Sequence, residues 1–73
     1  MIQLFLKMSW NDAIMLSQDL DMYLPNIKEV EKINLPYKFW TNCADSMLEA
    51  YNSKKEKIKT NELLNVVLVK RIK

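Results

Sequence analysis

The sequence predicts a mainly α-helical domain built from three short helices. Apolar residues recur at helical spacing in two long stretches, and capping residues or prolines stand at the ends of these stretches. The chain has 73 residues, enough for one domain, and its 49% apolar and 27% charged residues are typical of a folded domain. We therefore expect one domain over residues 1–73, with helices at about 10–23, 27–34 and 37–52.

The first helix is expected to begin after Ser9. The Ser9 hydroxyl can accept a hydrogen bond from a free backbone N–H of the first turn, and Asp12 stands three residues later, as in a capping box. Apolar residues then follow at helical spacing as far as Leu24. Pro25 ends the helix because proline disfavours helical geometry in the preceding residue.

The second helix is expected to be short. Asn26 and Glu29 repeat the capping pattern, and apolar residues spaced three apart continue to Ile33 before Pro36 closes the segment. A strand would require alternation with a period of two, which the charged residues of this segment interrupt.

The third helix has the most regular apolar pattern. Its apolar residues fall at i, i+3, i+4, i+7, i+8 and i+11, which forms one stripe along a helix. Asn52 and Ser53 are reasonable stop signals. The stripe consists of Trp40, Cys43, Ala44, Met47, Leu48 and Tyr51.

The two ends of the chain, residues 1–7 and 61–72, are open to two interpretations. The N-terminal segment alternates weakly and the apolar C-terminal segment is rich in β-branched residues, so the two segments can pair as a short β-ribbon. Alternatively, Thr60 caps a fourth helix. A basic segment at 54–59 separates the third helix from the C-terminal segment.

The predicted core lies between the three helices, and both tryptophans belong to it. On a helix, the adjacent Phe39 and Trp40 cannot both point into one core, so Phe39 or Tyr37 is expected to face outward. The predicted core residues are Trp10, Ile14, Leu20, Val30, Ile33, Trp40, Ala44, Met47 and Leu48.

The first helix is apolar on more than one side, because Met15 and Met22 lie off the stripe that begins at Trp10. A second apolar side in so small a domain needs another surface to cover it. We therefore expect a homodimer or a protein partner. The predicted partner-binding residues are Met15, Met22, Tyr37 and Phe39.

The charge of the chain is unevenly distributed. Residues 1–50 carry four lysines against seven acids, a net −3, whereas residues 51–73 carry seven basic residues against two acids, a net +5. Such asymmetry suggests an acidic partner. A protein is favoured over a nucleic acid, since only one basic residue is Arg and no aromatic residue interrupts the lysine run. The expected contacts are Lys54, Lys55, Lys57, Lys59, Lys70 and Arg71.

The composition argues against an enzyme. The chain has no His, no Gly and one Cys, so it contains no His-based catalytic triad, no His metal ligand, no internal disulfide and no Gly-rich phosphate loop. We expect no catalytic, cofactor-binding or metal-binding residues.

A cytoplasmic location is expected. No purely apolar run exceeds the length of the one at 66–69, which is far shorter than the roughly 20 residues of a membrane-spanning helix, so no membrane partner is expected. A single free Cys43 suits a reducing compartment.

Residues 8–50 resemble the middle of T4-type phage late-transcription coactivators. Those are small helical proteins that bind a flap element of the host RNA polymerase and link it to the sliding clamp. The resemblance implies a phage-type regulator in the host cytoplasm that docks an apolar helix face on a large machine, although the basic end departs from the acidic tail of that family. The matching segments are Met8–Ala13, Leu24–Pro25, Leu35–Pro36, Lys38–Trp40 and Ala44–Leu48.

Two other functions fit the same predicted elements. An N-terminal strand followed by two helices also resembles a dimeric ribbon-helix-helix DNA-binding protein, in which Gln3 and Lys7 would face DNA. A protein-binding inhibitor of a host defence or a host enzyme is the third possibility.

Overall fold

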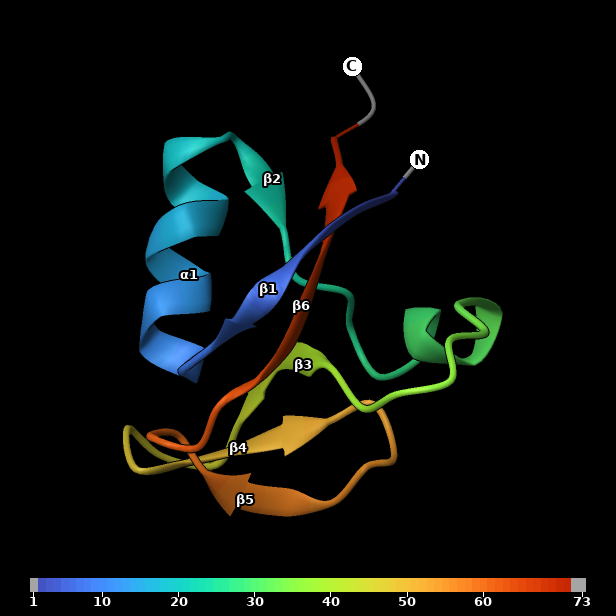
Figure 1. The fold of residues 1–73 in the computed structure, drawn as a ribbon. Coiled ribbons are helices and arrows are strands. Elements are labelled where there is room, and N and C mark those ends of the chain that lie inside the picture. The colour runs from blue at the N-terminus through green and yellow to red at the C-terminus, as the bar shows by residue number, and fades with distance from the viewer. Residues whose placement is uncertain (1, 72–73) are drawn as a thin grey trace.

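The computed structural model describes residues 2–71 and shows a mostly β domain. It contains two three-stranded antiparallel sheets and one α-helix, which covers one side of the first sheet (Figure 1). The prediction of a mainly α, three-helix bundle is therefore wrong. No helix within residues 2–71 is both long and apolar enough to cross a membrane.

The first sheet joins the two ends of the chain. Its strand order is β1 (Ile2–Met8), β6 (Leu64–Lys70) and β2 (Met22–Tyr23), with β6 in the centre. The sheet resolves the open alternative in favour of paired terminal strands; residues 1 and 72 of the predicted segments lie outside the described residues. Between Phe5 and Met8 the β1–β6 register shifts by one residue, as in a β-bulge.

The second sheet replaces the helix expected at 37–52. Its strands are β3 (Trp40–Ala44), β4 (Glu49–Asn52) and β5 (Lys57–Lys59), paired in sequence order by two short hairpins. The predicted stripe is not buried as a unit: Trp40 is buried, whereas Cys43, Ala44, Met47 and Leu48 are exposed. Their helical spacing in the sequence therefore does not correspond to a shared face in the structure.

The helix α1 (Trp10–Asp19) begins as predicted and ends early. Ser9 lies in an extended conformation and its hydroxyl accepts a hydrogen bond of 3.3 Å from the Asp12 backbone N–H. Leu20 is the C-cap of the helix. Asp21 follows with a φ of 51°, a left-handed conformation that turns the chain into β2. The predicted helix to residue 23 is therefore too long, and Leu20 is 44% exposed instead of in the core.

The predicted helix at 27–34 shrinks to a single 3₁₀ turn, η1 (Glu29–Lys32). The capping pair itself is present. The Glu29 N–H donates to Asn26 Oδ1 at 2.8 Å, and the Asn26 N–H donates to Glu29 Oε1 at 3.1 Å. Capping satisfies the first turn, but Ile33 is already extended, so no second turn follows.

Apolar side chains pack on both faces of β6 and form two clusters. The first cluster lies between β6, α1 and β3, with Val66 and Leu68 of β6 on that face. The second is smaller, and its buried residues are Val30, Phe39 and Val67. The alternation of β6 side chains between these clusters explains its continuous apolar sequence, because a strand buried on both faces has no polar side. The first cluster is centred on Ala13, Leu24, Trp40, Ala50, Val66 and Leu68.

The indole N–H groups of the two tryptophans join the second sheet to α1 and to the first sheet. Trp10 Nε1 donates to the Thr41 carbonyl of β3, and Trp40 Nε1 donates to the Met8 carbonyl of β1, each at 2.9 Å. A buried carbonyl needs such a donor, since leaving it unpaired costs about 1–3 kcal/mol. The two hydrogen bonds therefore fix the second sheet against α1 and against β1 of the first sheet.

Candidate functional site

The turn between β3 and β4 carries two large apolar side chains in solvent. Residues 45–48 form this turn, which we call the Met47–Leu48 turn. Met47 is 84% exposed and Leu48 is 75% exposed. Turns usually contain Gly, Pro, Asn, Asp or Ser, so exposed Met and Leu at a turn need an explanation outside local folding.

The main chain of the Met47–Leu48 turn is held by its own hydrogen bonds. The backbone N–H groups of Asp45 and Ser46 both donate to the Glu49 carbonyl, at 3.0 and 3.2 Å. The Leu48 N–H donates to Ser46 Oγ at 3.1 Å. The turn thus has a defined shape before any partner binds.

Buried Thr60 anchors the same turn to the rest of the fold. Its hydroxyl donates to the Met47 carbonyl at 3.0 Å and its N–H donates to the Leu48 carbonyl at 2.9 Å. The Thr60 carbonyl accepts from the Trp10 N–H at the start of α1. One residue that is 4% exposed therefore links the turn, the segment after β5 and the helix, which lie together at one end of the domain (Figure 1).

A shallow groove of about 560 Å³ runs beside the turn. Charged side chains lie near its margin: Lys57 Nζ is 3.4 Å from Asp45 Oδ2, and Glu49 stands opposite Lys59 on β5. An apolar centre with a polar rim is the usual composition of a protein-binding surface. The groove is lined by Asn11, Ser46, Met47, Leu48, Glu49, Lys59, Thr60 and Asn61.

Asp45 and Lys57 form an ion pair near the turn. The hydrogen bond and charge of Asp45 raise the pKa of Lys57. Over residues 2–71, no three His, Cys, Asp or Glu side chains gather in a position to hold a metal ion. The Met47–Leu48 turn therefore offers a partner an apolar contact surrounded by charged side chains.

The predicted partner-binding residues do not form one surface. Met15 is 62% exposed on α1, as expected. Phe39 or Tyr37 was expected to face outward, and Phe39 does not, because it is only 2% exposed and belongs to the second cluster. Met22 packs against the first cluster, and Tyr37 is half-buried.

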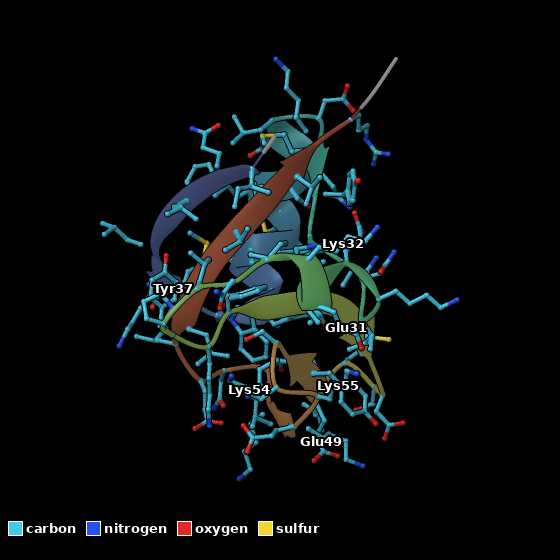
Figure 2. All side chains as sticks on the ribbon, turned by 90° about the vertical axis from the view of Figure 1, so that its right-hand side faces the viewer. Glu31, Lys32, Tyr37, Glu49, Lys54 and Lys55 are labelled. Atoms are coloured by element: carbon cyan, nitrogen blue, oxygen red, sulfur yellow. The ribbon has the colours of Figure 1, made fainter. Side chains whose placement is uncertain are left out.

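Half of the predicted basic contacts are paired with carboxylates. Lys55 lies 3.0 Å from Glu31 across the gap between η1 and the β4–β5 turn (Figure 2), and Lys57 pairs with Asp45. Arg71 lies 3.3 Å from Asp21 and also above the Tyr23 ring. Lys54, Lys59 and Lys70 make no ion pair with the residues that the structure describes.

The ion pair between Lys38 and Glu56 makes the stability of the fold depend on pH. A hydrogen bond from Lys38, at 2.8 Å, holds the pKa of Glu56 below its ordinary value, and a hydrogen bond from Asn52 adds to the effect. A carboxylate with a lowered pKa stabilises the fold above its unfolded pKa, about 4.3, and loses this contribution as the pH falls through its folded pKa. Glu56→Gln should therefore lower the free energy of unfolding near neutral pH, with a difference from the wild type that vanishes in acid.

Urea unfolding of the wild type and Glu56→Gln at about pH 7 and about pH 3 measures this difference. Glu62→Gln is the control, since Glu62 makes no ion pair with residues 2–71. An equal deficit of Glu56→Gln at both pH values would contradict the assignment.

The sequence does not predict the Met47–Leu48 turn, because the helical spacing of Met47 and Leu48 indicates a core stripe. Asp45 and Ser46 were the available signal, since both residue types are common in turns and directly precede the two apolar residues.

Comparisons with protein-family models, with curated proteins and with solved structures find no match.

Proposed function

We propose that this chain is a non-enzymatic protein-binding domain of the cytoplasm, and that the Met47–Leu48 turn is its contact surface. One observation supports the proposal above others: two large apolar side chains remain exposed on a main chain that hydrogen bonds hold in place. Their burial by a partner removes apolar area from water, worth about 25 cal/mol per Å².

The fixed turn makes this burial efficient. A flexible loop would lose conformational freedom on binding, whereas a turn already held by Thr60 and Ser46 loses little. Met47 adds adaptability, because its unbranched thioether side chain fits irregular apolar pockets. The partner we expect presents an apolar pocket that accepts both side chains.

Replacing Met47 and Leu48 by Ser tests the proposal. We expect Met47→Ser with Leu48→Ser to weaken partner binding by tenfold or more, about 1.4 kcal/mol or above, as for central contact residues. Stability should change by less than about 0.5 kcal/mol, since both side chains are exposed. The readout is affinity enrichment with mass spectrometry, followed by calorimetry on the purified partner.

The matched control is Met15→Ser, an exposed methionine on α1. A partner lost with Met15→Ser but retained by the double variant would contradict the assignment of the Met47–Leu48 turn. Photo-crosslinking from position 49, at the groove margin, should label the same partner.

Host RNA polymerase remains the predicted partner by resemblance, and it is the first purified protein to offer in this experiment. The contact surface that we propose for this partner is, however, the Met47–Leu48 turn and not an apolar helix face. The DNA-binding alternative required a strand followed by two helices, and after β1 and α1 this chain continues instead into strand β2. Inhibition of a host enzyme is a form of protein binding and is tested by the same variants.

A further inference from the structure

The strand β1 is an edge of the first sheet. It pairs with β6 on one side, and within residues 2–71 no strand pairs with its other side. In Figure 2 it forms the left margin of the molecule. Alternate backbone N–H and C=O groups of such an edge point away from the sheet and can extend it by one more strand.

The outer face of this edge is apolar. Ile2, Leu4 and Leu6 alternate along β1 and are 40%, 51% and 86% exposed; we call them the β1 row. Leu4 stands beside buried Val67 of β6, and Ile2 stands beside Val69, so the row extends the apolar surface of the sheet. Natural edge strands usually carry charges at such positions.

We propose that β1 pairs with β1 of a second copy of this chain, antiparallel and about a two-fold axis at Leu4. The β1 row is symmetric in this arrangement: Leu4 stands opposite Leu4 of the second copy, and Ile2 stands opposite Leu6. An isologous contact needs this self-complementarity. The two sheets then become one of six strands, in the order β2-β6-β1-β1-β6-β2.

The single charge of β1 favours antiparallel over parallel pairing of the two copies. Lys7 lies three residues from Leu4, so antiparallel pairing places the two lysines six residues apart, about 20 Å at roughly 3.3 Å per residue. That exceeds the screening length of about 8 Å at physiological salt. Parallel stacking in register would instead place lysine beside lysine.

The register shift next to Lys7 limits the contact to two copies. Regular pairing is interrupted between Phe5 and Met8, so the segment available for a new ladder is short. Two-fold pairing covers the β1 edge of both copies, and the outer strand that remains on each side, β2, has only two residues. This interface is separate from the Met47–Leu48 turn, so its test is independent of the proposed function.

Disulfide trapping tests the position of the axis. In an antiparallel pair, opposite Cα atoms lie about 4.5–5.5 Å apart, within the range that a disulfide spans. With Cys43→Ser removing the natural thiol, Leu4→Cys should form a covalent dimer in oxidised glutathione. The control is Met15→Cys in the same background, an exposed methionine on α1, which should form no disulfide-linked dimer.

A charge exchange tests the same contact without a covalent bond. Leu4→Lys alone and Leu4→Glu alone should each be monomeric by sedimentation, because each places like charges side by side. Their equal mixture should recover dimers, since lysine then faces glutamate. A wild type that stays monomeric at every concentration, or a mixture that fails to dimerise when the wild type does, would overturn the proposal.

Discussion

Trp40→Ala should remove most of the stability of the domain. Trp40 is fully buried at the centre of the first cluster, and truncating a buried Trp costs about 3–5 kcal/mol. A chain of this length has a total stability of about 4–11 kcal/mol, at about 0.05–0.15 kcal/mol per residue. Urea unfolding followed by far-ultraviolet circular dichroism should show the midpoint shifted strongly to lower urea.

The indole hydrogen bond can be separated from the packing with Trp40→Phe. This variant keeps much of the buried ring but leaves the Met8 carbonyl without its donor, at a cost of about 1–3 kcal/mol. Its stability should therefore lie between those of the wild type and Trp40→Ala. Met15→Ala is the surface control and should change stability by less than about 0.5 kcal/mol; a similarly small change for Trp40→Ala would show that Trp40 is not a core residue.

Phe39→Ala should be the second most damaging change, with a local effect as well as a global one. Within residues 2–71, Val30 and Val67 are the other buried residues of the second cluster, and truncating a buried Phe costs about 3–5 kcal/mol. Residues of the segment at 26–38 pack on Val67 of β6 in this cluster: Val30 is buried there, and Ile33 and Leu35 pack against it. Hydrogen exchange should therefore accelerate over that segment by more than over the first sheet.

Phe39→Leu is the matched control for this experiment. It keeps an apolar side chain of similar bulk, so it should cost less than about 1.5 kcal/mol and leave the exchange pattern intact. If Phe39→Ala accelerated exchange equally in all elements, the second cluster would be part of one cooperative core, contrary to this prediction.

The contrast between Phe39 and Trp40 explains why the fold class was mispredicted. On a helix two adjacent apolar residues cannot share one core, which predicts that Phe39 or Tyr37 faces outward. In extended backbone, adjacent side chains point to opposite sides, and here a cluster lies on each side. Periodicity within one segment carries no information about a second cluster formed by distant residues.

Interactions within three residues, in contrast, were predictable. The Ser9 cap and the Asn26–Glu29 pair both appear as expected, since each depends only on neighbouring backbone. The contacts that set the sheets involve Trp10 with Thr41 and Met8 with Trp40, which are 31 and 32 residues apart. No local pattern encodes these pairs.

The candidate site was missed for the same reason. Met47 and Leu48 match an apolar helical stripe in sequence, but their position is set by Thr60, a residue 12 or 13 positions away. A polar residue that anchors a turn from outside its own hairpin leaves no signature in the turn itself.

The central place of β6 has a consequence for synthesis of the chain. Its pairing partner β1 is made first, and roughly 60 residues must follow before β6 is complete, which takes about 3–12 s at about 5–20 residues per second. During this interval Ile2, Leu4 and Phe5 have no native strand to pair with, and neither cluster on β6 can form. The nascent chain therefore exposes an aggregation-prone apolar segment for seconds. We expect its solubility during translation to depend on chaperones that bind such segments.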